Sequence, residues 1–373
     1  MKVIRTFHPV GQGAFYTEVF FEADIRQFVM VYDCGTETAV DAMAVSLDDQ
    51  IQNFKKSLGN NPKIDLLFIS HFHDDHISGI TELLDGVKVV KTIIPMLNWP
   101  ALTVTRVRNY LRLYSNNAEL ADDIDQVIVD LYLNRSQNGK YGEVEIVSPN
   151  TDDYPSLDEQ TEGGIVSNRR KIVSGGRLLG YKRIWEYIPF NSIEFNNQHA
   201  IDLLNGLMQL AGVKKPEDLD ISSLVRTRLD EVQKEYRKAM NNNRSDNLYT
   251  LVVGSQPVDD IIVKPCPRLS HCIYFGDFDS KNNQVLWSRL NNVIEYHNMG
   301  TVQVPHHGAK VNWRTEMGIG DPRHYVVSTG TTNGYHHPNY WVIEEIWERG
   351  HRPYVISEKW EEGLVYKFEL FEL

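Results

Sequence analysis

The chain has 373 residues, of which 42% are hydrophobic and 24% are charged, and its formal net charge is −12. This composition excludes general disorder and suits one large α/β domain with insertions, or two small domains. The negative charge argues against a broad basic surface that coats nucleic acid, but it is compatible with a nuclease whose phosphate contacts are local.

The sequence predicts a cytoplasmic protein without a membrane segment. No apolar run approaches the roughly 18 residues that a membrane-spanning helix needs. At the start of the chain, Pro9 is reached before a signal-like apolar segment can form. Three cysteines (Cys34, Cys266 and Cys272) are too few, and odd in number, for a disulfide framework.

The first hundred residues predict strands with two helices among them. Alternating patterns favour strands over 3–7, 16–22 and 28–32, with Gly11-Gln12-Gly13 as an interruption. Helical spacing covers 40–58 and resumes near 78. The apolar run 64–69 is typical of a strand buried on both faces, and a further strand is expected over 87–95.

The pattern changes at about residue 98, where a mostly helical insertion over 98–245 is expected. Its helices are predicted at 101–115, 118–133, 199–211 and 219–240, around a polar, glycine-containing stretch. The strand pattern then returns at 247–253, 271–276, 300–305, 324–329, 353–357 and 364–371, with helices at 284–296 and 338–349. We therefore expect a single domain over 1–373, with the insertion between two strand-rich halves.

The most specific motif follows the buried strand 64–69. His71, His73, Asp75 and His76 form the pattern H-x-H-x-D-H. Neutral imidazoles and a carboxylate are the ligands that zinc takes in proteins. His71 and His73 project alike by the two-residue repeat, and the turn moves Asp75 and His76 to a neighbouring position. One cluster can thus supply two metal ions, an arrangement suited to hydrolysis of phosphate esters. The alternative is a solvated, histidine-rich loop.

With Asp33-x-Gly35 upstream, this motif resembles the metallo-β-lactamase superfamily. The resemblance implies an α/β fold, a four-layer αβ/βα sandwich, with two metal ions at the sheet edges. It also implies that a later aspartate bridges the two ions. Asp277, in Gly276-Asp277 after a predicted strand, matches that aspartate, although by itself it would be interpreted as a turn residue.

Three short segments resemble one subgroup, the hydrolase domain of ComEC-type competence proteins. They are Val10-Gly11-Gln12-Gly13, Val304-Pro305-His306-His307-Gly308, and Ser328-x-Gly330 with Asn333-Gly334-Tyr335-His336-His337-Pro338. That domain is thought to degrade DNA, and its relatives include phosphodiesterases such as the phosphorylcholine esterase. The resemblance covers 1–97 and 247–345, and it leaves out the insertion.

These segments add candidate site residues. We expect His307 to hold the second metal ion and His306 to face the substrate as a catalytic residue, although the order of the two stays open. His337 would protonate a leaving group or bind a phosphate, or else cap a helix. Gly13 would offer a backbone amide to the substrate, with a plain tight turn as the alternative. Asp75 is expected to be needed for turnover as well as for metal binding.

The chain departs from the superfamily pattern in one place. A further histidine ligand is common between the first cluster and the bridging aspartate, whereas this chain has Asn247 in the corresponding region. We take Asn247 as a substrate contact. The first ion would therefore lack the nitrogen ligand that this further histidine supplies. Two Zn²⁺ ions are expected, and an oxygen-richer site would favour Mn²⁺ instead.

The insertion contains a basic stretch that includes Arg169 and Arg170. Tyr181, Trp185 and Tyr187 are interleaved with its cations. Such a stretch would bind a phosphate backbone and stack bases, and the alternative is a solvated loop packed by its aromatic residues.

Together these features predict a metal-dependent hydrolase of phosphodiesters, with DNA or RNA as substrate. A small-molecule phosphodiesterase acting on a nucleotide or a choline-type phosphoester is the alternative, and hydrolysis of C–N or C–S bonds is less compatible with the motifs. A partner-gated effector subunit that docks a protein through 98–245 also stays open.

Overall fold

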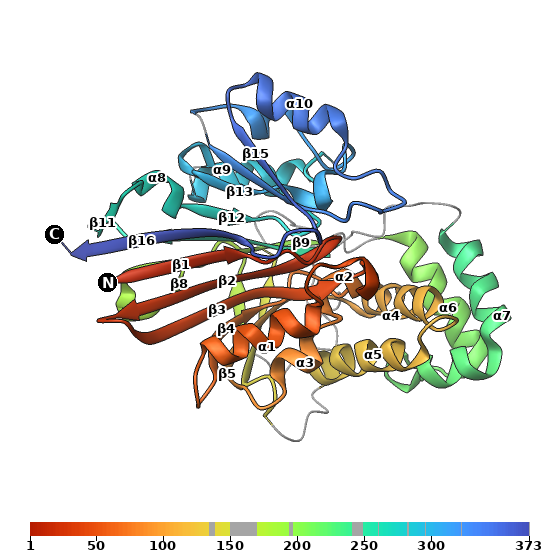
Figure 1. Ribbon diagram of the computed structural model, residues 1–373. Coiled ribbons are helices and arrows are strands. Elements are labelled where there is room, and N and C mark those ends of the chain that lie inside the picture. The colour runs from red at the N-terminus through yellow and green to blue at the C-terminus, as the bar shows by residue number, and fades with distance from the viewer. Residues whose placement is uncertain are drawn as a thin grey trace.

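The computed structural model describes residues 1–133, 139–149, 170–193, 197–240, 249–259, 261–281, 283–294, 296–321 and 323–372. Two β-sheets face each other in the middle of the molecule, and helices cover their outer faces (Figure 1). The first and last strands of the chain lie side by side, because β1 pairs with β16 in antiparallel register. No helix in the described ranges is long and apolar enough to cross a membrane.

The first sheet contains nine strands within the described residues, in the order β11-β16-β1-β2-β3-β4-β5-β6-β7. The strands from β3 to β7 run parallel, whereas β11, β16, β1, β2 and β3 pair antiparallel in that order. Their bounds are β1 (Lys2–Phe7), β2 (Gly13–Glu22), β3 (Ile25–Thr36), β4 (Lys63–Phe68), β5 (Lys88–Pro95), β6 (Glu143–Ser148), β7 (Arg170–Val173), β11 (Ile261–Lys264) and β16 (Leu364–Glu372).

The second sheet contains seven strands in the same part of the chain, in the order β15-β14-β13-β12-β10-β9-β8. The strands from β12 to β15 run parallel, and β8, β9, β10 and β12 pair antiparallel. Their bounds are β8 (Leu178–Leu179), β9 (Trp185–Ile193), β10 (Tyr249–Pro257), β12 (Cys272–Tyr274), β13 (Thr301–Gln303), β14 (His324–Ser328) and β15 (Arg352–Ile356).

Three hydrophobic clusters hold the layers together. The central cluster joins the sheets, with Phe68 of the first sheet and Tyr274 of the second among its fully buried members. A second cluster packs α1 (Leu47–Ser57), α3 (Ile80–Leu84) and α5 (Ala118–Leu133) on the first sheet. A third packs α9 (Gln284–Ile294) and α10 (Tyr340–Glu348) on the second sheet. The result is the expected α/β fold, the layered αβ/βα sandwich of the metallo-β-lactamase fold.

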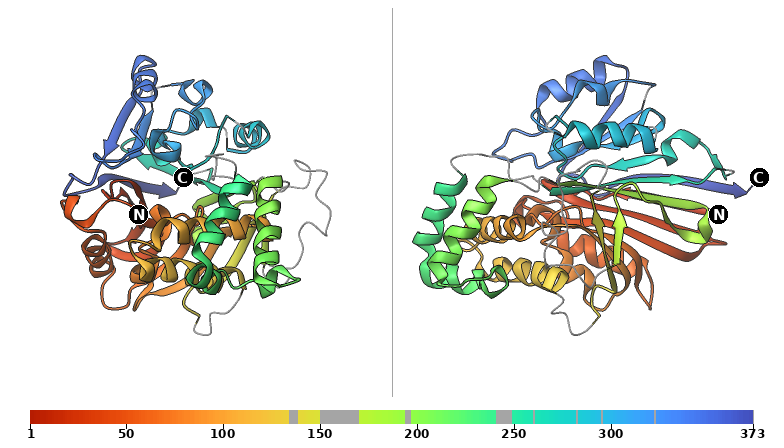
Figure 2. Two further views of the ribbon diagram at one scale, coloured as in Figure 1. Left: turned by 90° about the vertical axis from the view of Figure 1, so that its right-hand side faces the viewer. Right: turned by 180° about the vertical axis from the view of Figure 1, so that it is seen from behind.

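A fourth cluster lies at one end of the molecule. There α6 (Gln198–Ala211) and α7 (Ile221–Met240) pack against α4 (Trp99–Leu113), and Figure 2 shows these helices beyond the ends of the sheets. Asn197 begins α6 by accepting a hydrogen bond from the Ala200 amide, and Gly212 ends it in a left-handed conformation (φ 70°). These helices are the helical part of the predicted insertion.

The expectation of a mostly helical insertion over 98–245 misses four strands. Strands β6 to β9 lie inside that range and extend both sheets. β6 is a short β-branched run that follows a glycine turn, so it gives only a weak signal. β9 contains Pro189, a residue that argues against a central strand, yet β9 pairs with β10 over nine residues. The stretch is therefore partly built into the sandwich and is not a separate helical appendage.

His8 joins the first sheet to α1. Its ring stacks on Phe15 at a centroid distance of 4.1 Å, and its Nε2 atom lies 3.1 Å from Thr17 Oγ1. Burial lowers the pKa of His8 to about 3, whereas an unfolded chain would protonate this ring near pH 6.5. The folded chain therefore disfavours the protonated form of His8. This group leaves the free energy of unfolding at its full value above pH 6.5 and lowers it as the pH falls towards 4.

We expect His8→Gln to lose less stability than the parent on acidification from pH 7 to 4, by roughly 1–3 kcal/mol. Urea unfolding at several pH values would measure the free energy of unfolding. His199→Gln, a substitution on α6, is the control. Parallel pH profiles for the parent and the His8 variant would contradict the prediction.

Candidate metal centre

The candidate site residues follow the carboxyl ends of parallel strands from both sheets. The loop after β4 carries His71 to His76, and the loop after β12 carries Asp277. The turn Pro305–Gly308 after β13 carries the histidine pair. Because these strand ends meet at one edge of the sandwich, residues more than 200 positions apart come within a few ångströms of one another.

Two close groups of ligand atoms result. Asp75, His76, Asp277 and His307 form one, and His71, His73 and Asp75 form the other, with the ligand atoms of each group within 4.8 Å of one another. His307 Nε2 lies 3.1 Å from Asp75 Oδ2, and His76 Nε2 lies 3.2 Å from Asp277 Oδ1. All six side chains are buried. The structure thus brings together all six residues expected to bind metal.

The unpartnered atoms of these residues fit divalent cations. His71 Nε2, His76 Nε2 and Asp277 Oδ1 are buried without a hydrogen-bond partner. Buried polar atoms are rarely left in that state unless a ligand completes them. Imidazole nitrogens with carboxylate oxygens are a typical donor set for zinc, and manganese accepts such a set as well. The donor atoms therefore fit two divalent ions, one at each group.

The rings are held with Nε2 towards the site. His76 Nδ1 donates to Asp33 Oδ2 (2.8 Å), and the same carboxylate accepts from the Ser70 amide and hydroxyl at 2.7 and 2.6 Å. His307 Nδ1 donates to the Ser328 carbonyl (2.8 Å). An oxygen acceptor on Nδ1 leaves the lone pair on Nε2, the usual arrangement behind a metal-binding histidine. The sequence showed Asp33 only as part of a motif, and its contact with His76 is seen only in the folded chain.

Two glycines allow the metal-binding loop to lie directly on the β2–β3 hairpin. A Cβ atom at Gly35 would stand 2.6 Å from the backbone of His76, and one at Gly13 would stand 2.8 Å from the Asp75 carbonyl. Any side chain there would displace α2 (Asp74–Ile77), which carries both ligands. The structure places Gly13 behind the loop in a packing role, and its expected contact with substrate stays a prediction.

Burial and the neighbouring charges shift the pKa values of the candidate ligands in different directions. Burial acts to raise the pKa of Asp277, but His306, His71 and His76 outweigh it and hold that pKa well below the ordinary range. Burial lowers the pKa of His71 and the pKa of His73. The positive charge of Arg108 lowers the pKa of His73 further. Burial thus favours neutral imidazoles at His71 and His73, whereas the carboxylates of Asp75, Asp277 and Asp33 outweigh burial and raise the pKa of His76 well above its ordinary value.

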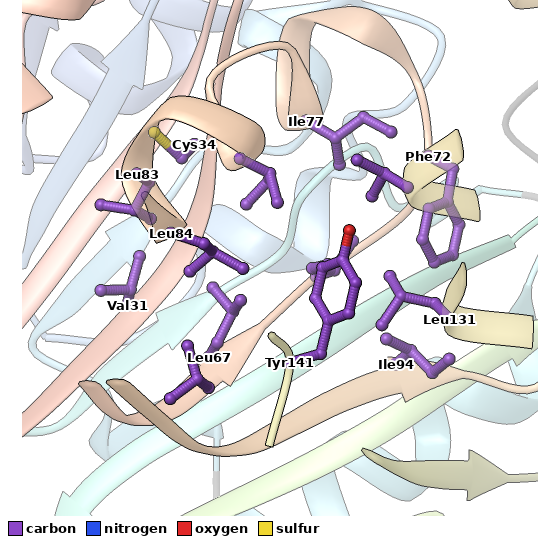
Figure 3. Packing of buried hydrophobic residues seen from close by; sticks show 14 of the residues in the cluster. Val31, Cys34, Leu67, Phe72, Ile77, Leu83, Leu84, Ile94, Leu131 and Tyr141 are labelled. Carbon is purple, nitrogen blue, oxygen red and sulfur yellow. The ribbon is translucent and has the colours of Figure 1, made fainter. Parts of the chain in front are cut away.

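Helix α4 braces the metal-binding loop from the side of the insertion. Asn109 Nδ2 donates to the Phe72 carbonyl (2.6 Å), and Arg112 Nε lies 3.4 Å from Asp74 Oδ2 while its Nη2 pairs with Glu37. Phe72 itself is anchored in the core beside Leu131 of α5, as Figure 3 shows. These contacts link the insertion to the site, and nothing in the local spacing of α4 indicates them.

His306 and His337 lie beside the two close groups. His306 Nε2 is 3.6 Å from Asp277 Oδ2, and the rings of His306 and His337 are 5.6 Å apart. Helix α10 is capped by Asn339, so His337 does not serve as its cap. Burial, with His306 and His307 nearby, lowers the pKa of His337 to about 4. A ring that is neutral at pH 7 is better suited to hydrogen bonding than to proton donation.

The structure corrects the prediction that the aromatic residues of the basic stretch bind nucleic acid. Trp185 and Tyr187 are fully buried between the sheets, where Tyr187 donates to Glu18, so neither can stack a base. Arg170 begins β7 and pairs with Glu145 (3.1 Å), three strands away from β4, which precedes the metal-binding loop. Arg169 and Asn247 lie outside the described residues.

The fold and the paired ligand groups define the protein as an α/β protein with a candidate two-metal centre at the edge of its sheets. The model of the metallo-beta-lactamase superfamily matches residues 22–154, which include the whole H-x-H-x-D-H motif. The match covers about a third of the chain, and over these residues the chain is similar to that superfamily.

Two relatives are similar to a short part of the chain. Ribonuclease J of Mycoplasma pneumoniae is 30% identical over 95 residues, and Ribonuclease J of Mycoplasma genitalium is 28% identical over 98 residues. Each match covers 26% of this chain, but only 16% and 17% of the respective relative.

Two solved structures are similar over longer spans. The metallo-beta-lactamase fold protein YhfI from Bacillus subtilis is 9% identical, with 98% of this chain and 99% of that chain covered and a TM-score of 0.38. MEM-A1, a subclass B3 metallo-beta-lactamase from a soil metagenome library, is 15% identical, with 52% and 53% covered and a TM-score of 0.23. Both TM-scores are below 0.5, so neither likeness bears on function.

The contact between Asp33 and His76 makes a prediction about metal affinity. Asp33→Asn keeps the side-chain size and tolerates the left-handed backbone at this position (φ 56°). It weakens the acceptor of His76 Nδ1, so we expect metal affinity to fall by about 10- to 100-fold, the usual effect of losing such a contact. Zinc titration with a competing chelator would measure this affinity.

Asp24→Asn is the matched control, because Asp24 also has a left-handed φ (61°) and is exposed in the β2–β3 turn. It should bind zinc like the parent. If both variants kept the parental affinity, the assigned contact between Asp33 and His76 would have no part in metal binding.

Proposed function

We propose that this protein is a metal-dependent hydrolase that cleaves phosphodiester bonds, with DNA or RNA as its substrate. The observation that carries the proposal is the pair of buried ligand groups that share Asp75. Two adjacent divalent ions would activate water near neutral pH and offset the charge on a phosphoryl group. Sites of this kind serve in-line displacement at phosphate esters.

The side chains of the site have separate tasks in this proposal. Asp75 and Asp277 supply the negative charge that retains the ions, and their low pKa values keep that charge at neutral pH. His337, at the side of the site, would donate a hydrogen bond to the phosphoryl group or to the leaving oxygen. Asn109 and Arg112 of α4 keep the metal-binding loop in place.

The choice of nucleic acid is supported by similarity alone. The short match to Ribonuclease J includes no more than about a quarter of the chain, and the resemblance to ComEC-type hydrolase domains concerns motifs on both sides of the insertion. We therefore propose a nuclease related in its site to these proteins. The fold and the ligand groups do not depend on this finer assignment.

A small-molecule phosphodiesterase is the second candidate, and one observation favours it. The cations of the expected nucleic-acid-binding stretch are engaged in ion pairs, since Arg170 pairs with Glu145, Arg177 with Glu186 and Lys182 with Glu22. These three ion pairs partly neutralise the positive charge that a basic track along this stretch would need, and the net charge of the whole chain is −12. A nucleotide or a choline-type phosphoester would need no such track.

A protein partner remains a proposal for the insertion. Helix α4 contacts the metal-binding loop on one side and packs against α6 and α7 on the other. A partner that docks on the α6–α7 end would therefore act on the site through α4.

The hydrolase proposal predicts cleavage that depends on the carboxylates of Asp75 and Asp277. Zinc- or manganese-loaded protein would be offered single-stranded DNA, duplex DNA, RNA and bis(p-nitrophenyl) phosphate. We expect Asp277→Ala and Asp75→Ala to lower turnover by at least about 1000-fold, because each removes negative charge that retains the ions, and the ions stabilise the phosphoryl group. Asp202→Ala on α6 is the control. Full turnover in either site variant would exclude the proposed mechanism.

The effect of salt on substrate affinity distinguishes a polymer substrate from a small one. A nuclease should lose affinity steeply with added salt, because phosphate contacts release counterions. Lys310 follows the turn Pro305–Gly308 and lies over the Trp341 ring (4.8 Å), so Lys310→Ala should reduce the slope of log affinity against log salt by about one. Arg170→Ala should leave the slope unchanged. Affinity for oligonucleotides that is insensitive to salt would instead favour the small-molecule enzyme.

A further inference from the structure

We propose that His306 is a metal ligand, and that its Nε2 atom supplies the third protein nitrogen on the side of His71 and His73. The inference rests on the proposed metal-dependent function and deepens it. His306 is the histidine of the 305–308 turn that neither close group includes. In this assignment its Nε2 atom replaces the histidine ligand that the superfamily commonly has between the first cluster and the later aspartate.

The first observation is how the Asp277 carboxylate divides its neighbours. Its Oδ1 atom faces His76 Nε2 (3.2 Å) and His307 Nε2 (4.0 Å). Its Oδ2 atom faces His71 Nε2 (3.5 Å) and His306 Nε2 (3.6 Å). Each oxygen therefore has two imidazole nitrogens beside it, one from the H-x-H-x-D-H loop and one from the 305–308 turn. If Oδ1 belongs to one ion, Oδ2 and its two nitrogens form the corresponding set for the other.

The second observation is the orientation of the His306 ring. Asn312 Nδ2 donates to the carbonyls of Asp277 (3.1 Å) and Phe278 (3.3 Å), so the amide oxygen of Asn312 must face the opposite way. That oxygen lies 2.9 Å from His306 Nδ1, which must then carry the proton and donate it. In the neutral form of the ring, a proton on Nδ1 leaves the lone pair on Nε2, which lies 3.6 Å from Asp277 Oδ2.

The same arrangement is present at the other histidines of the site. His71 Nδ1 lies 2.9 Å from the Ser70 hydroxyl, and His76 and His307 donate from Nδ1 to Asp33 and to the Ser328 carbonyl. In each case an oxygen fixes Nδ1. Nε2 of His71 and of His76 then lies beside the Asp277 carboxylate, and Nε2 of His307 lies nearest to Asp75 (3.1 Å). Such a contact at Nδ1 sets the tautomer of a metal-binding imidazole. His306 shares both halves of this arrangement, which a histidine that only lines the site would not need.

The third observation is the backbone of the turn. His306 and His307 have left-handed φ values of 48° and 53° in succession, a conformation that residues other than glycine adopt rarely. The His306 amide donates to the Gly276 carbonyl (2.9 Å), which ties the turn to the residue before Asp277. This backbone directs two adjacent side chains to the two oxygens of one carboxylate, and a regular turn would direct only one.

The chemistry of the alternatives favours a cation as the partner of His306. The non-bridging oxygens of a phosphodiester carry no proton, so they offer nothing to an acceptor nitrogen. Two donors of one zinc ion, each about 2.1 Å from it, stand up to about 4.2 Å apart, and the 3.6 Å between His306 Nε2 and Asp277 Oδ2 lies within this limit. The His306 side chain is 30% exposed, so its ring lies on the open side of the site, where it has room to adjust.

Metal counting on matched variants tests the inference. His306→Asn and His307→Asn both preserve the left-handed backbone, because asparagine tolerates it. Each protein would be loaded with zinc, dialysed, and measured by elemental analysis and by chelator competition. We expect two ions per chain in the parent and one in each variant, with affinity for the lost ion reduced by at least about 100-fold. His199→Asn should keep two ions.

A second variant and a spectroscopic readout separate metal binding from misfolding. Asn312→Leu removes the acceptor of His306 Nδ1 and should weaken one ion by about 10- to 100-fold without removing it. In manganese-loaded protein, the electron paramagnetic resonance signal of a coupled pair should become that of a single ion in His306→Asn. Circular dichroism would verify that each variant is folded.

The outcomes are distinct. A folded His306→Asn protein that holds two ions with parental affinity overturns the inference and leaves the proposed function intact. A parent that holds a single ion also overturns it. A parent that binds no divalent ion at all contradicts the proposed function itself.

Discussion

The carboxylate of Asp277 is buried among the rings of four histidines that come from two loops on different sheets. A charge taken out of water in this way is costly unless it is paired. Here the neighbouring imidazoles hold the pKa of Asp277 well below its ordinary range, although burial alone would raise it. The surrounding loops must therefore keep the nitrogens close to this carboxylate, and each loop is fixed by its own hydrogen bonds. Cations that bind there complete the same electrostatic requirement.

The sandwich satisfies this requirement through strand direction. β4 and the strands from β12 to β14 run parallel within their own sheets, and their carboxyl ends deliver the ligand loops to one edge. Packing then sets the height of the loops above that edge. Phe72 and Ile77 are anchored in the core below α2, and Gly13 and Gly35 let the loop lie on the hairpin behind it. The core of the fold and the geometry of the site are thus the same set of contacts.

The insertion belongs to this arrangement in two ways. Its strands β6 and β9 extend the sheets, so the aromatic residues Trp185 and Tyr187 are buried in the central core. Its helix α4 contacts the metal-binding loop through Asn109 and Arg112. A segment whose composition suggested a surface for nucleic acid therefore serves mainly to build and brace the sandwich, as far as its described residues show.

The sequence alone determined the local features. The spacing of His71, His73, Asp75 and His76 after an apolar strand predicted that these residues lie together as candidate ligands, because side chains that leave one strand end have positions fixed by the backbone repeat. Asp277 and the 306–307 pair could be selected only through resemblance, since no local pattern relates them to residue 71. Tertiary structure alone decided which oxygen of Asp277 faces each histidine, and that Asp33, Ser328 and Asn312 fix the rings. It also decided that Gly13 lies behind the loop and that Arg170 pairs with Glu145, three strands away from β4. The physical reason is that these relations depend on which strands end side by side, and that is set by the packing of the whole chain.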